Sequence, residues 1–228
     1  MATFANSSLA VYTHISPHKR DRTQNITKIT IHHMAGNVSV ESCGNVFQGE
    51  RVASSNYGIG SDGRVAMYVE ERHRAITSSS TDNDNQAVTI EVANNSGAPN
   101  WLVSDKAYNA LLDLCVDICR RNGIEKLTYD GTPNGSLTHH QMFAPTTCPG
   151  PYLLARFPQI CDIVNERLGV KLGEPSGTGD NPSPWAKDAT EWAKKLGLFA
   201  GDGAGNYGWQ ETVTREALAV VLCRLMGG

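Results

Sequence analysis

Two stretches of the chain alternate apolar and polar side chains with a period of two residues, which is the pattern of a β-strand. Residues 28–32 read KITIH and residues 87–92 read AVTIEV, and both are rich in the β-branched side chains that favour strands. In a third stretch, residues 56–65, apolar residues flank an Asp-Gly pair, which predicts a β-hairpin. We expect these segments to form the central strands of a sheet.

Longer stretches repeat apolar residues every three or four positions, which predicts amphipathic helices. Residues 104–123 form the first, with Ser104 as the expected N-cap and Gly123 as the expected stop. Residues 152–168 form the second, which we expect to be interrupted near Pro158. Strands that alternate with helices indicate an α/β fold with a central mixed β-sheet flanked by helices.

The composition changes sharply after Leu172. The stretch that follows, GEPSGTGDNPSP, is rich in Gly, Pro and Ser and is typical of a flexible linker. We therefore predict one domain over residues 1–172, a linker over residues 173–182 and a small helical module over residues 183–228. The module contains three of the four Trp and none of the seven His, so we expect the chemistry to lie in the larger domain.

The overall composition is that of an ordinary globular protein, with 228 residues, 40% hydrophobic residues and a formal net charge of -3. This near balance of charges offers no basic surface for phosphates, so we expect no nucleic acid ligand. No run of about eighteen apolar residues predicts a membrane span. The first charged residue is Lys19, so we expect no signal peptide and production in the cytoplasm. The six cysteines are scattered, and we expect them to be mostly reduced.

Two polar side chains lie within the predicted strands. Alternation places His32 at the end of the first strand, on the face opposite Ile29 and Ile31. Glu91 lies in the middle of the second strand, on the face opposite three apolar residues, and a carboxylate there needs a partner or a function. The alternative is a glutamate of an edge strand in a surface ion pair, and the strand pattern alone favours it.

A third group of candidate residues lies on the Pro-rich segment LTHHQMFAPTTCPGP, residues 137–151, which contains His139, His140 and Cys148. Imidazole and thiolate are donors that zinc prefers. A thiolate activated by an imidazole could instead attack an amide as a nucleophile. A surface histidine and a buried cysteine without catalytic function are the third interpretation. The spacing of eight residues between His140 and Cys148 does not decide among them.

Taken together, residues 8–170 resemble the zinc-dependent N-acetylmuramoyl-L-alanine amidases of the type 2 amidase and peptidoglycan recognition protein superfamily. ITIHHMAG resembles the opening motif of that family, whose first histidine is a metal ligand. HQMFAPTTCPG resembles its closing motif, in which a histidine and a cysteine eight residues apart are both ligands. The resemblance therefore implies that His32, His140 and Cys148 bind Zn²⁺.

The same resemblance assigns further roles. VTIEVANN is similar to the strand that supplies the catalytic glutamate, which implies Glu91 as the general base. SNYGIGSDG resembles the intervening hairpin, with Asn56 where many relatives have a histidine. Thr146, two residues before the cysteine, could donate a hydrogen bond to a developing oxyanion. Three protein ligands leave a fourth zinc position for water, so the implied chemistry is metal-assisted amide hydrolysis.

The resemblance also implies a substrate and a role. The substrate is the amide bond between N-acetylmuramic acid and L-alanine in bacterial peptidoglycan. A wall-directed enzyme without a signal peptide is typical of a phage endolysin, which is made in the cytoplasm and acts on the cell wall after release. The alternative is a non-catalytic peptidoglycan recognition protein. Relatives that only bind commonly lack the zinc cysteine, whereas Cys148 is present.

The C-terminal module carries two apolar stripes at helical spacing, one through Trp185, Trp192 and Leu196 and one through Leu218 and Leu222, which predict a two-helix core. Its sequence, WAKDATEWAKKLGLFAGDG followed by VTREALAVVLCRL, resembles a single S-layer homology repeat, a family that attaches proteins to cell-wall polymers. One copy of about 45 residues is marginal as an independent fold. We therefore expect a secondary cell-wall polymer as its partner, and either packing on the larger domain or pairing of chains into a homo-oligomer.

Overall fold

The computed structural model describes residues 4–170, 182, 186–199, 201–202, 205–209, 213 and 215–226. The chain divides into two compact units, Met1–Val170 and Lys171–Gly228. Of the predicted linker, only Pro182 is among the described residues, and Trp185 of the predicted stripe also lies outside them. Among the described residues, no helix has the length and apolar character needed to cross a membrane.

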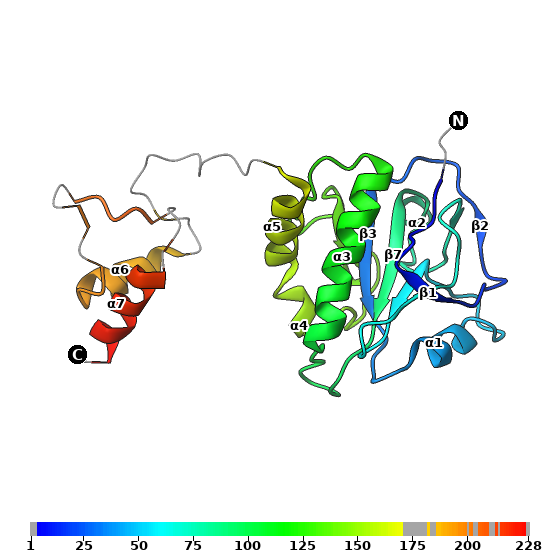
Figure 1. Ribbon diagram of the computed structural model, residues 1–228, viewed down its shortest axis with the longest axis horizontal. Coiled ribbons are helices and arrows are strands. Elements are labelled where there is room, and N and C mark those ends of the chain that lie inside the picture. Colours follow the sequence, from blue (N-terminus) through cyan, green and yellow to red (C-terminus); the bar gives the residue numbers. More distant parts are fainter. Residues whose placement is uncertain are drawn as a thin grey trace. The chain divides into compact units, whose positions relative to one another are not determined.

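The larger unit contains a mixed six-stranded sheet with the order β1-β5-β4-β7-β3-β8 (Figure 1). Neighbouring strands run parallel, except for the antiparallel pair of β4 and β5 that the Asp-Gly pattern predicts. A small second sheet pairs β2 with β6. These observations confirm the predicted α/β fold with a central mixed sheet. The strands are β1 (Ala10–Thr13), β2 (Arg20–Asp21), β3 (Lys28–His33), β4 (Tyr57–Ile59), β5 (Val65–Met67), β6 (His73–Arg74), β7 (Ala87–Val92) and β8 (Leu137–His139).

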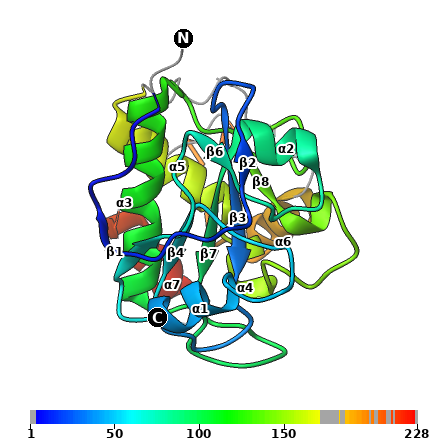
Figure 2. The ribbon, with the colours of Figure 1, turned by 90° about the vertical axis from the view of Figure 1, so that its right-hand side faces the viewer.

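Helices cover both faces of this sheet. Figure 2 shows α3 (Asp105–Asn122) and α2 (Thr81–Gln86) on opposite sides of the strands. The predicted ends of α3 are confirmed, because Ser104 Oγ accepts a hydrogen bond from the N–H of Ala107 and Gly123 adopts the left-handed conformation that ends the helix. The face that carries α2 also carries α1 (Val40–Val46).

The second predicted helix is two helices, α4 (Pro151–Leu154) and α5 (Phe157–Leu168). The interruption falls at residues 155–156, just before Pro158, rather than at the proline itself. Pro158 lies in the first turn of α5, where its missing N–H removes no helical hydrogen bond. The proline therefore begins a helix instead of breaking one.

The alternation along β3 and β7 sorts their side chains between the two faces. Ile29 and Ile31 pack with the apolar residues of β7, α3 and α5 in the main core. Thr30, His32 and Glu91 lie on the other face, as the period of two residues requires. Because β7 lies between β4 and β3, Glu91 belongs to a central strand, and the edge-strand alternative is wrong.

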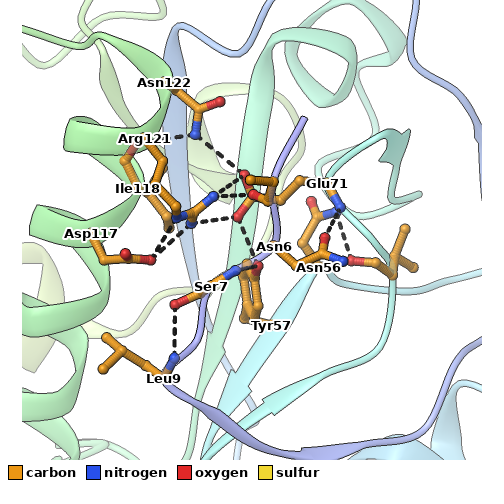
Figure 3. Close-up of polar contacts among 12 residues, drawn as sticks. Asn6, Ser7, Leu9, Asn56, Tyr57, Glu71, Asp117, Ile118, Arg121 and Asn122 are labelled. Carbon is orange, nitrogen blue, oxygen red and sulfur yellow. Dashed lines mark hydrogen bonds and ion pairs between the residues drawn. The ribbon is translucent and has the colours of Figure 1, made fainter. Parts of the chain in front are cut away.

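A buried carboxylate ties the N-terminal segment, β4 and α3 together (Figure 3). Glu71 has no exposed surface and accepts hydrogen bonds from the hydroxyl of Tyr57 at 2.7 Å and from two guanidinium nitrogens of Arg121 at 2.7 and 2.9 Å. Tyr57 in turn accepts a hydrogen bond from the N–H of Ser7 at 2.8 Å. Each charge is paired and hydrogen-bonded, which a buried ion pair requires. The network holds the C-terminal end of α3 on the face opposite Glu91.

The C-terminal unit contains the two predicted helices, α6 (Lys187–Lys195) and α7 (Arg215–Leu225). Most of the large apolar side chains described in the two stripes are exposed, whereas Ala193 is buried. Trp192, Leu196, Leu218 and Leu222 are about half exposed, with relative accessibilities between 48% and 53%. The ring of Trp209 stacks on Tyr207 and meets Phe199 edge-on.

Candidate metal centre

The structure brings the three predicted metal ligands together at one edge of the sheet. His32 lies near the end of β3, and His140 follows β8 directly as the first residue of a short 3-10 helix (His140–Met142). Because β3 and β8 are parallel neighbours, their carboxyl ends meet. Cys148 reaches the same point from the loop before α4. Their nitrogen and sulfur donor atoms all lie within 4.8 Å of one another.

The spacing of these donors suits a tetrahedral zinc ion. Cys148 Sγ lies 3.5 Å from His32 Nδ1. Zinc–sulfur and zinc–nitrogen bonds of about 2.3 and 2.0 Å at a tetrahedral angle require a separation of roughly 3.5 Å. In this geometry Nδ1 is the metal-binding atom of His32, and its other ring nitrogen, Nε2, is buried without a hydrogen-bond partner. The residues present therefore fit the metal that the donor set favours.

Burial shifts the pKa values of the two types of donor in opposite directions. It lowers the pKa of His32 well below its usual value, and the neighbouring His140 contributes in the same direction, so the imidazole is neutral and able to bind a cation. Burial raises the pKa of the Cys148 thiol, with Glu91 adding to the effect. These surroundings favour the neutral thiol, so a nearby cation is needed to hold Cys148 as the thiolate that binds a metal. The backbone N–H of His33 donates to Cys148 Sγ at 3.4 Å, which would stabilise a thiolate ligand.

Glu91 lies beside this group, since it pairs in register with His32 across β7 and β3. Its Oε2 atom is buried and has no hydrogen-bond partner, although other atoms of the residue remain accessible. Burial raises the pKa of Glu91 to about 8, against a smaller opposing effect of the Arg51 charge. None of the ion pairs formed by the described residues includes Glu91. The surface ion pair interpretation is therefore wrong for this carboxyl.

The ligands and Glu91 line one cavity of about 350 Å³. Thr146 also lines it, and its Oγ1 accepts a hydrogen bond from the N–H of Cys148 at 3.2 Å. That contact uses a lone pair of Thr146 Oγ1 and leaves the hydroxyl proton free to point at a molecule bound in the cavity. His139 points away from the group, because its ring packs edge-on against Phe157 with ring centres 5.2 Å apart.

Several residues around the cavity were not predicted from the sequence. Arg51 is the one lysine or arginine among the described residues that line it, and its charge acts on both Glu91 and His140. An exposed loop arginine carries no motif, so no local pattern could have revealed it. Asn56, at the family's histidine position, does not line the cavity. Its amide instead bonds to backbone atoms of Thr89 and Val69 inside the fold.

Comparison with solved structures finds chains with a similar fold. A selenomethionine derivative of AmpD matches with a TM-score of 0.55 and 20% identity, over 70% of this chain and 98% of that chain. The Staphylococcus aureus hydrolase AmiA in complex with its ligand matches with a TM-score of 0.54 and 17% identity, over 74% of this chain and 94% of that chain. A mutant endolysin from Bacillus subtilis matches with a TM-score of 0.53 and 11% identity, over 67% of this chain and 97% of that chain. At these identities the likeness concerns the fold. No curated protein matches the sequence.

Residues 22–151 match the N-acetylmuramoyl-L-alanine amidase family. This range contains His32, Glu91, His140 and Cys148, and it covers more than half of the chain. The protein is therefore a member of the N-acetylmuramoyl-L-alanine amidase family, within the type 2 amidase superfamily.

Proposed function

We propose that this protein is a zinc-dependent amidase that hydrolyses the amide bond between N-acetylmuramic acid and L-alanine in bacterial peptidoglycan. The observation that carries the proposal is the donor group of His32, His140 and Cys148, within 4.8 Å, in a cavity shared with Glu91. A recognition protein needs a groove but no metal ligands. The complete donor set with an unpaired buried carboxylate beside it therefore favours catalysis over recognition alone.

In the proposed mechanism, His32, His140 and Cys148 would hold a Zn²⁺ ion, which would supply Lewis acidity for the scissile carbonyl and the attacking water. Glu91 takes the proton that the water loses and delivers it to the nitrogen of the leaving amine. Its raised pKa suits the second half of this transfer, because the carboxyl can hold a proton near neutral pH before it delivers that proton to the leaving amine. Thr146 Oγ1 donates a hydrogen bond to the oxygen that gains negative charge.

Digestion of purified peptidoglycan tests the reaction directly. We expect the zinc-loaded protein to release new L-alanine amino termini, and a chelator to stop their release until zinc is restored. New reducing sugar ends in place of amino termini would identify a glycosidase instead. Tight binding to peptidoglycan without any new termini would leave the recognition protein as the better explanation.

We further propose that the chain has three parts, an amidase domain over residues 1–172, a linker over residues 173–182 and an S-layer-homology-like module over residues 183–228. In this proposal the protein is a phage-type endolysin, made in the cytoplasm, and the module binds a secondary cell-wall polymer or pairs two chains. The half-exposed apolar side chains of α6 and α7 support a partner for the module. Sedimentation with cell walls, before and after chemical removal of that polymer, tests the first alternative, and light scattering tests the second.

A further inference from the structure

Three threonines form a row across neighbouring strands below the candidate centre. Thr30 pairs in register with Thr89 of β7 on one side and with Thr138 of β8 on the other. All three side chains are fully buried. Each threonine lies two residues before a site residue: Thr30 before His32, Thr89 before Glu91 and Thr138 before His140. The first two pairs each lie in one strand, whereas His140 directly follows the strand of Thr138.

Two of these hydroxyls close a ring with a buried amide of α2. Asn83 Nδ2 donates to Thr30 Oγ1 at 2.9 Å, and Thr30 Oγ1 lies 2.8 Å from Thr138 Oγ1. Thr138 Oγ1 lies 3.4 Å from two acceptors, Asn83 Oδ1 and the carbonyl oxygen of Ile29. When Thr30 donates to Thr138 and Thr138 donates to Asn83, each hydroxyl in the ring donates once and accepts once, and the amide contributes both a donor and an acceptor. Such directed rings strengthen each of their bonds.

The third threonine takes part in a separate network. Thr89 Oγ1 accepts a hydrogen bond from the N–H of Asn56 at 3.1 Å and lies 3.1 Å from the hydroxyl oxygen of Thr77. Thr77 lines the cavity, and its hydroxyl donates to the carbonyl oxygen of Ser54, another lining residue, at 2.6 Å. The Thr89 network therefore connects the strand of Glu91 to the cavity wall, whereas the Asn83 ring connects the strands of the two histidines.

Packing alone does not require polar side chains at these positions. The opposite face of β3 is filled by Ile29 and Ile31, and valine has nearly the volume and shape of threonine. Apolar contacts are non-directional, so they fix the relative position of two strands less strictly than a hydrogen-bonded ring does. A metal site needs its ligands held within about 0.5 Å. The ring joins β3 and β8 two residues before His32 and His140.

We propose that Thr30, Thr138 and Asn83 form a positioning ring that holds His32 and His140 at metal-binding separation. Thr89, in the same row, positions Glu91. The inference rests on the proposed zinc site but concerns residues outside the donor set. Thr30 and Thr138 therefore affect metal affinity, whereas Thr89 affects turnover.

Thr138→Val tests the ring, because it removes the hydroxyl and keeps the side-chain shape. We expect zinc affinity, measured by competition with a chromophoric chelator, to fall roughly 10- to 100-fold, the usual effect of losing a hydrogen-bonding group behind a ligand. The visible spectrum of the cobalt-substituted variant should also change, because ligand geometry sets its band intensities. Thr138→Ser restores the hydroxyl and should restore both values. Thr13→Val, at an exposed position of β1, is the matched control and should leave both unchanged.

Thr89→Val should give the opposite pattern, with zinc affinity and cobalt spectrum retained and kcat reduced. A folded Thr138→Val protein with wild-type affinity and spectrum would overturn the ring. If Thr138→Val does not fold, Asn83→Ala removes the α2 member of the ring without changing a strand residue. Normal zinc affinity of the Asn83→Ala protein would also overturn the positioning ring. A wild-type protein that binds no zinc at all would instead overturn the proposed function, and the inference with it.

Discussion

The two units of this chain use the same helical pattern with different results. Helix α3 buries its apolar stripe completely, and Leu111 and Leu114 have no exposed surface. Helix α7 has a comparable stripe, yet Leu222 and Leu225 remain 48% and 51% exposed. The difference lies in what each helix meets, since α3 packs against a six-stranded sheet and α5. A periodic pattern therefore predicts a helix, but burial needs a partner surface of sufficient area.

The comparison extends to chemistry. In the larger unit, burial changes the properties of functional groups, because it lowers the pKa of His32 and raises that of Glu91. In the described part of the C-terminal unit, the only buried apolar side chains are Ala193 and Leu198, and neither carries a functional group. We therefore expect catalysis to depend on the first unit alone. The following predictions test that separation, beginning with the largest effect.

Removal of any one metal ligand should have the largest effect. We expect His32→Ala, His140→Ala and Cys148→Ala each to abolish both zinc retention and turnover, because two remaining ligands bind the ion weakly. Metal analysis after gel filtration and the release of L-alanine termini measure the two quantities. Leu222→Ser on exposed α7 is the control and should change neither. A Cys148→Ala protein that keeps one zinc per chain, or a wild type inactivated by alkylation but not by chelators, would favour a nucleophilic cysteine.

Glu91→Gln should separate chemistry from metal binding. The substitution keeps the shape of the side chain and removes its basicity, so we expect turnover to fall by roughly 10²- to 10⁴-fold with zinc content unchanged. Zinc analysis, melting temperature and hydrolysis rate should be measured on one sample. Near-normal turnover with full zinc would exclude Glu91 from the mechanism.

The same substitution should change how the stability of the metal-free protein depends on pH. The folded-state pKa of Glu91, about 8, lies above the ordinary value of 4.5, so the folded state binds the proton more tightly than the unfolded state. Its contribution to stability is fully present below pH 4.5 and is lost as the pH rises through about 8. The loss should be on the order of a few kcal/mol, because each pKa unit corresponds to about 1.4 kcal/mol.

Urea unfolding of the metal-free protein between pH 4 and pH 9 measures this effect. Glu91→Gln should flatten the decline and become more stable than the wild type above pH 8. Identical pH profiles for the two proteins would show that Glu91 is solvated in the folded state, contrary to its buried position.

Removal of residues 171–228 should have the smallest effect on chemistry. We expect the shortened protein to keep its zinc and its turnover of a soluble muramoyl peptide, since every proposed site residue lies in Met1–Val170. Binding to intact cell walls should fall by about tenfold or more if the lost unit supplies a second contact. Co-sedimentation with walls measures that binding. Loss of turnover on the soluble peptide would contradict the separation of the two units.

Much of the fold was predictable from the sequence because the signals are local. The β7 bounds agree with the AVTIEV pattern, the Asp-Gly hairpin forms, and the Ser104 cap and Gly123 stop bound α3 as expected. The candidate site also depended on sequence, but on family motifs rather than on spacing, since a histidine and a cysteine eight residues apart favour no single chemistry. Local patterns could place His32 and Glu91 on faces of strands but could not show that the two side chains lie close together.

The tertiary structure decided the remaining questions, because each depends on contacts between distant parts of the chain. The order of strands makes β7 central and gives Glu91 a buried setting, which excluded the edge-strand ion pair. The same order aligns Thr30 with Thr138, 108 residues apart, and lets Asn83 join them. In the C-terminal unit, the stripe was predicted but its exposure was not. A sequence by itself determines which side chains can be buried on one face, whereas burial is determined by the surface that the folded chain brings against that face.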